Sequence, residues 1–81
     1  MQQVALLENH NHRLEVFKIG PQYFDAITVD KTNGRTSKTT LRGRFAQQKV
    51  RKFVRERMRR MENYQLSFSY QFQQLHRLPE H

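Results

Sequence analysis

The chain has 81 residues, with 15 lysines and arginines against seven aspartates and glutamates, so its formal net charge is +8. That length fits one small domain with a thin core, because only 36% of the residues are hydrophobic and tryptophan is absent. Cysteine is also absent, which excludes disulfides and thiolate metal sites and favours a reducing, cytoplasmic location. No stretch has the length of a membrane span or the pattern of a signal peptide.

Residues 1–12 give no clear secondary-structure signal, and we interpret them as a flexible segment. The apolar residues 4–7 fit either a short strand or a helical turn. His10 and His12 are two residues apart, but no third ligand type lies nearby, so the pattern favours a solvated loop over a metal site. We therefore expect neither a metal nor a cofactor.

Extended structure is predicted to begin at Arg13. Residues 14–19 and 22–29 are rich in β-branched and aromatic side chains, and a Gly-Pro pair at positions 20 and 21 separates them. Asn33-Gly34 then predicts a hairpin, because both residues tolerate the positive φ of a type I′ turn. A third strand over residues 36–41 would pair back on the second.

The stretch 42–60 holds nine cations against one acid, so its net charge equals that of the whole chain. Its apolar residues recur every three or four positions, which predicts an amphipathic helix. Those apolar positions are Ala46, Val50, Phe53, Val54 and Met61. The opposite side of this helix would carry Arg44, Arg51, Lys52, Arg55 and Arg59. Arg57 falls inside the apolar stripe, where we expect it to extend its guanidinium towards water.

The residues after Asn63 fit two structures. Leu66, Phe68, Tyr70 and Phe72 alternate with polar residues as in a strand, but several aromatics also continue the phase of the preceding helix. Neither glycine nor proline separates the two stretches, so we favour a helical tail and keep a fourth strand as the alternative. Residues 79–81 are interpreted as a disordered end.

Together these patterns predict an α+β fold in a single domain over residues 13–78. A three-stranded antiparallel sheet (β-β-β-α) would pack against one long basic amphipathic helix, and the aromatic tail would be helical or a fourth strand. A homodimer would add apolar area to so small a core.

The concentrated positive charge favours non-catalytic binding of nucleic acid. The cations expected to contact it are Lys31, Arg35, Lys38, Arg42, Arg44, Arg51, Lys52, Arg55 and Arg59. Duplex DNA is favoured over RNA, since no aromatic platform for stacking single-stranded bases is evident. The simpler alternatives are a solvated helix face and a charged strand edge that opposes aggregation. Repulsion between arginines four residues apart on the helix argues for an external anion instead.

Three other functional classes remain open. An accessory protein of the phage or plasmid type could bind a host protein through the aromatic residues Tyr64, Phe68 and Phe72. A small ribonuclease could use His10, His12 and Tyr64, but no catalytic constellation supports it, and we predict that the protein is not an enzyme. Basic amphipathic helices also bind anionic membranes, which we consider unlikely for a helix that follows a hairpin.

Overall fold

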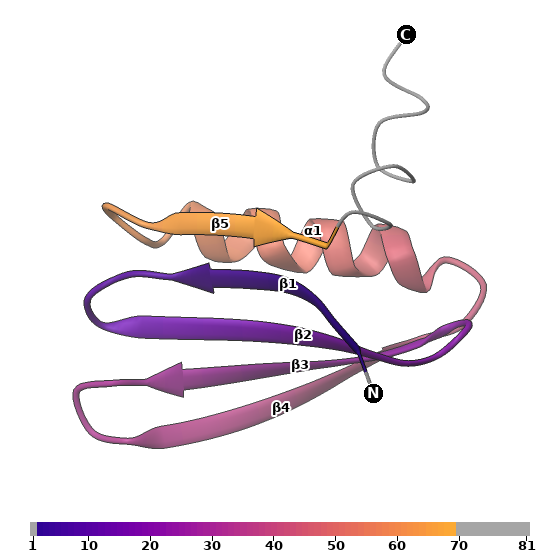
Figure 1. The fold of residues 1–81 in the computed structure, drawn as a ribbon, viewed down its shortest axis with the longest axis horizontal. Helices are drawn as coiled ribbons and strands as arrows, with labels where there is room; N and C mark the ends of the chain where they lie inside the picture. Colours follow the sequence, from indigo (N-terminus) through magenta and orange to yellow (C-terminus); the bar gives the residue numbers. More distant parts are fainter. Residues whose placement is uncertain (1, 70–81) are drawn as a thin grey trace, which may run out of the picture.

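A computed structural model describes residues 2–69, which form one antiparallel sheet and one helix. The elements in order are β1 (Gln2–Glu8), β2 (His12–Gly20), β3 (Tyr23–Asp30), β4 (Arg35–Arg42), α1 (Ala46–Met58) and β5 (Gln65–Phe68). The strands lie in the order β4-β3-β2-β1-β5, and α1 connects the two outermost strands (Figure 1).

The predicted three-stranded sheet with one long helix is wrong. The sheet has five strands, and α1 has only 13 residues. β1 lies in the stretch that we interpreted as flexible, and it pairs with β2 on one side and with β5 on the other.

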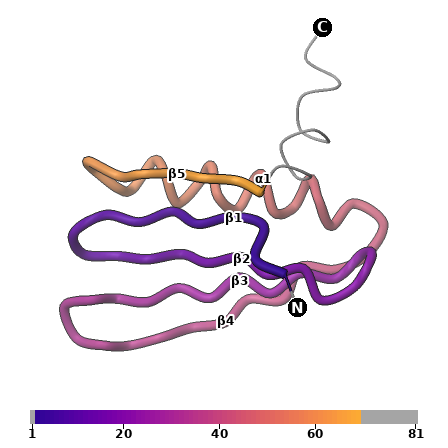
Figure 2. The backbone as a smooth tube through the Cα atoms, viewed as in Figure 1, coloured from indigo at the N-terminus to yellow at the C-terminus, as the bar shows by residue number. Residues whose placement is uncertain are grey.

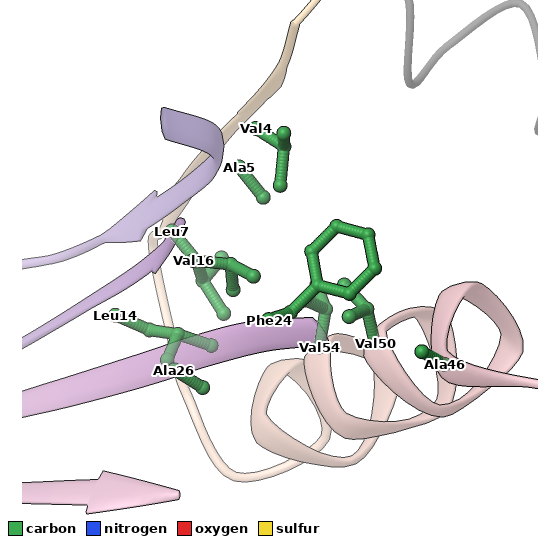
Figure 3. Packing of buried hydrophobic residues seen from close by; sticks show 10 residues of the cluster. All are labelled: Val4, Ala5, Leu7, Leu14, Val16, Phe24, Ala26, Ala46, Val50 and Val54. Atoms are coloured by element: carbon green, nitrogen blue, oxygen red, sulfur yellow. The ribbon is translucent and has the colours of Figure 1, made fainter. Parts of the chain in front are cut away.

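The core fills the space between α1 and one face of the sheet, called here the helix-side face. Residues directly opposite each other in the register share this face, such as Val16 with Ala26 and Leu7 with Leu14. Phe24 of β3 points at Val50 and Val54 of α1 (Figure 3). Within the described part of the chain, the buried hydrophobic residues are Val4, Ala5, Leu7, Leu14, Val16, Phe24, Ala26, Ala46, Val50 and Val54.

The two predicted hairpins are present, although one turn differs from the expected type. Gly20 pairs with Tyr23 across the Gly-Pro turn. In the β3–β4 turn, Gly34 has a φ of +74° and its N–H donates to the Asp30 carbonyl at 2.7 Å, whereas Asn33 does not have a positive φ. The type I′ prediction is therefore wrong, because that turn needs positive φ at two successive central residues.

Gly43 brings the chain from β4 onto the helix-side face. Its φ of +108° is a conformation that residues with a side chain rarely adopt. The Gly43 N–H donates to the Gln22 carbonyl at 2.9 Å, and the Gly43 carbonyl accepts from the Ala46 N–H at 3.1 Å. The start of α1 is thus fixed to the end of the β2–β3 turn.

The chain leaves α1 through Arg59 and reverses near Asn63, which has a φ of +53°. Residues Gln65–Phe68 then pair antiparallel with β1. The helical tail that we favoured is wrong for this stretch. The part of the predicted tail that includes Phe72 lies outside the described residues.

The opposite face of the sheet, called here the open face, is not covered by α1. It carries the half-buried Leu6, Phe17 and Ile27 together with charged side chains. Two ion pairs lie on it, Arg13 with Glu15 at 3.3 Å and Lys38 with Asp25 at 3.7 Å. Within residues 2–69, α1 is too short and too polar to cross a membrane.

Candidate nucleic-acid interface

The outward side of α1 forms an open groove, called here the α1 groove, with a volume of about 300 Å³. Four cations predicted to bind nucleic acid line it together. Lys52, Arg55 and Arg59 are exposed, and Arg51 is half-buried. The lining residues are Gln48, Arg51, Lys52, Arg55, Glu56 and Arg59. The helical spacing gathers these four cations as predicted, whereas the prediction that Arg44 lies on the same helix side is wrong, because α1 begins only at Ala46.

The cations of the α1 groove have no carboxylate partner within residues 2–69. The ion pairs of this part of the chain join Arg13 to Glu15, Lys31 to Glu8 and Lys38 to Asp25. Glu56 lines the groove but makes no ion pair there. The positive charge of α1 is therefore directed outwards and is not neutralised by the described acids.

Arg51 differs from its neighbours because part of its guanidinium is buried. Its Nε is buried and has no hydrogen-bond acceptor in the described chain, while the side chain as a whole is half-buried. A buried donor costs free energy unless water or an anion accepts its hydrogen bond.

Two further cations of the stretch 42–60 contact other groups of the protein itself. Arg57 is half-buried with its guanidinium carbon 5.4 Å from the centre of the Phe53 ring, the flank position expected for an arginine in the apolar stripe. Lys49 donates through Nζ to the Arg42 carbonyl at 3.0 Å. The Lys49 bond therefore helps to attach α1 to the end of β4, whereas the Arg57 contact lies within the helix.

The predicted cations of β4 do not form one surface with the α1 groove. Side chains alternate between the faces of a strand, and Lys38 and Arg42 lie on the open face with Asp25 and Tyr23. The Arg42 guanidinium carbon is 5.4 Å from the centre of the Tyr23 ring. Arg35 lies on the helix-side face, in register with Asp30.

Arg44 is exposed in the short connection between β4 and α1. It therefore lies at the start of the helix, whereas Arg59 lies at its end. Of the nine predicted cations, four line the α1 groove. The other five lie outside it.

Lys31 is engaged with the protein itself. Its Nζ lies 2.5 Å from Glu8 Oε2 and donates to the Asn9 carbonyl at 3.0 Å. The hydrogen bond from Lys31 is the main cause that holds the pKa of Glu8 below its ordinary value of 4.5, and Arg13 adds a smaller electrostatic contribution. This lysine is thus committed to joining two hairpins.

We expect Lys31→Gln to raise the pKa of Glu8 towards 4.5, because it removes the main cause of the lowered value. A lowered pKa in the folded state means that this carboxylate stabilises the fold above pH 4.5 and loses that contribution as the pH falls through the folded-state pKa. A carboxyl NMR titration measures the shift. Arg13→Gln is the control, with a smaller rise expected, and an unchanged Glu8 pKa in Lys31→Gln would contradict the assignment.

The residues predicted to bind a protein partner are not equivalent. Tyr64 is 38% exposed at the start of β5. Phe68 is partly buried and packs against the core, so its side chain contributes to the fold. Phe72 lies outside the described residues.

Sequence reasoning missed Phe45, which is 59% exposed at the first turn of α1. It occupies the N-cap position, where short polar residues that bond the helix N–H groups are usual, and it makes no such bond. Its position inside the most basic stretch of the chain was visible in the sequence. The apolar periodicity gave no way to tell that this ring lies outside the core.

Within the described residues, no group of three histidines, aspartates or glutamates is placed to hold a metal ion. Comparison of the chain with known protein families, with curated proteins and with solved structures found no match.

Proposed function

We propose that this protein binds nucleic acid without catalysing a reaction, with duplex DNA as the favoured partner and the α1 groove as the interface. The observation that carries the proposal is the set of four cations in one groove, none paired with a carboxylate of residues 2–69. Lysine and arginine that neutralise phosphates supply most of the affinity in such complexes. The cysteine-free composition supports a cytoplasmic location.

The shape of α1 supports a duplex partner. An α-helix with its side chains is about 10–12 Å across, and the major groove of B-DNA is about 12 Å wide. One side of α1 packs on the sheet through Ala46, Val50 and Val54, so its opposite, cationic side protrudes. Arg51, Arg55 and Arg59 follow one another at four-residue steps, which places these cations along the axis of α1 at intervals of about 6 Å.

Other residues would flank the proposed interface. Arg44 lies at the start of α1, and the exposed ring of Phe45 offers one apolar contact beside it. Arg35 lies on the same side of the sheet as α1. Lys38 and Arg42 are on the open face, so we assign them no contact with a duplex bound along α1.

The salt dependence of binding tests this proposal. If Arg51, Lys52, Arg55 and Arg59 each neutralise one phosphate, log K for a duplex falls with log salt at a slope of about −3.6, since each contact contributes about −0.9. Single-stranded RNA, at about −0.7 per contact, gives about −2.8. Fluorescence anisotropy with labelled oligonucleotides between low and physiological salt measures both slopes.

An acidic peptide with the same net charge as the duplex serves as a competitor that distinguishes binding to nucleic acid from binding to an acidic protein. We expect the duplex to bind more tightly than the peptide at equal ionic strength. A slope near zero for the duplex, or preference for the peptide, would contradict the proposal.

A further inference from the structure

Three segments that are distant in sequence meet at the end of the molecule where α1 finishes. They are the β1–β2 loop, the β3–β4 loop and the chain after α1, which all lie at the same end in Figure 2. The Lys31 N–H donates to the Asn11 carbonyl at 2.8 Å, and the Asn9 Nδ2 donates to the Glu62 carbonyl at 2.9 Å. Hydrogen bonds therefore fix the three segments against one another.

Between the β1–β2 loop and the chain after α1 lies a hollow of about 700 Å³, called here the helix-end hollow. Its lining includes His10 and His12 from the loop and Arg59 and Arg60 from the end of α1. The topology thus places two histidines and two arginines around one space, although almost fifty residues separate the pairs in the sequence.

Asn9 builds the wall of the helix-end hollow. Its Oδ1 accepts from the N–H groups of Asn11 at 2.9 Å and His12 at 2.8 Å, and its Nδ2 holds the Glu62 carbonyl. The polar atoms of this side chain are therefore all used within the protein. They fix the backbone of Asn11 and His12 independently of any ligand.

Three of the four basic side chains of the hollow are not used by the protein itself. Within residues 2–69, the side chains of His10, Arg59 and Arg60 make no hydrogen bond or ion pair. His12 faces the charge of Asp30, whose pKa is lowered mainly by hydrogen bonds from Thr32 and also by His12. The hollow therefore offers guanidinium and imidazole N–H donors to a ligand.

The two arginines of the hollow favour an anion, and their charge outweighs the partial negative charge at the C-terminal end of α1. Arg59 and Arg60 are exposed guanidiniums, and Glu62 is the only acid among the described residues that line the space. Guanidinium groups bind phosphate through paired N–H donors, and a neutral imidazole adds one further donor. Oxygen-rich tetrahedral anions match this donor set better than carboxylates do, because they accept from more directions.

We propose that the helix-end hollow binds a phosphate group through His10, His12, Arg59 and Arg60. The inference deepens the proposed function, because Arg59 lines both this hollow and the α1 groove. A nucleic acid that follows α1 would therefore place a backbone phosphate in the hollow. The alternative source of the same chemistry is a small phosphate monoester.

The first experiment titrates the protein with inorganic phosphate at fixed pH, with sodium chloride of equal ionic strength as the control, and follows the ¹H–¹⁵N NMR spectrum. We expect chemical-shift changes that saturate with a millimolar dissociation constant for phosphate. These changes are expected only for the amides of residues 9–12 and 59–63. The double variant His10→Gln/Arg60→Gln, which alters exposed side chains only, is expected to lose them. Arg42→Gln, an exposed cation on the open face, is expected to keep them. Shifts that chloride reproduces, or that survive in the double variant, would overturn the proposal.

The second experiment identifies the source of the phosphate. With a duplex, the double variant is expected to bind about tenfold more weakly and with a salt slope about 0.9 less steep, the loss of one phosphate contact. Unchanged duplex affinity together with lost phosphate shifts would assign the hollow to a small phosphate monoester. Absence of duplex binding by the unaltered protein would refute the proposed function alone, since the phosphate titration reads the hollow separately.

Discussion

Charge reversal of the three exposed cations in the α1 groove, Lys52→Glu/Arg55→Glu/Arg59→Glu, is expected to lower duplex affinity by at least about 1,000-fold. Each lost phosphate contact worth about 1.4 kcal/mol is a factor of ten, and the introduced carboxylates add repulsion. Arg51 is left unchanged because it is half-buried, so that its reversal would also disturb packing. Anisotropy titration at a single low salt concentration measures the loss.

The fold is expected to survive this change, because substitutions at exposed positions alter stability little. Part of the small loss of stability comes from replacing cations near the C-terminal end of α1, because cations there offset the helix dipole. A circular dichroism melt establishes that the variant is folded before binding is compared.

A neutral pair of variants separates position from net charge. Lys52→Gln/Arg55→Gln removes two charges from the α1 groove, and Lys38→Gln/Arg42→Gln removes two from the open face. We expect about 100-fold weaker duplex binding for the first pair and a much smaller change for the second. Equal losses would mean that binding follows total charge alone, and the α1 groove would no longer be the interface.

Phe24→Ala is expected to destabilise the protein by about 3–5 kcal/mol, the usual cost of removing a buried phenylalanine. Phe24 is 1% exposed and lies between the sheet and α1, beside Val50 and Val54 (Figure 3). Nothing would fill the space of the lost ring in the variant. Small domains have total stabilities near the lower end of about 5–15 kcal/mol, so most of the stability would be lost. Urea denaturation followed by circular dichroism measures the change.

Phe45→Ala is the matched control, since it makes the same substitution at a ring that is 59% exposed. Its unfolding free energy is expected to change by no more than about 0.5 kcal/mol. A similar loss of stability in both variants would contradict the division of these two rings between core and surface.

Part of the fold follows from local sequence signals. The Gly-Pro pair at positions 20 and 21 and the Asn-Gly pair at 33 and 34 lie in the two hairpin turns, because each signal depends only on its own backbone preferences. The apolar spacing of α1 was also informative, and Ala46, Val50 and Val54 are its buried residues.

The two missing strands have separate physical explanations. β1 contains a register shift between Gln3 and Ala5, so that the consecutive residues Val4 and Ala5 are both buried. This bulge removes the alternation by which a strand is recognised. β5 follows α1 without glycine or proline, and the reversal instead uses Asn63 in a left-handed conformation.

The grouping of the cations on α1 was predictable, but the positions of the cations on the strands and loops were not. Helical periodicity correctly gathered Lys52, Arg55 and Arg59, because residues on one helix have fixed relative positions. The division of the β4 cations between two faces depends on strand register. The meeting of His10 with Arg60 depends on β1, whose strand character the sequence did not reveal.

The path of the chain has a consequence for how the binding surface is made during folding. β1 to β4 form successive hairpins, so their contacts close short loops. The pairing of β1 with β5 instead joins Ala5 to Phe68 and encloses most of the chain, and the entropy of closing so long a loop slows this step. We therefore expect the hairpins to form early, whereas the helix-end hollow becomes complete only when the last strand has docked.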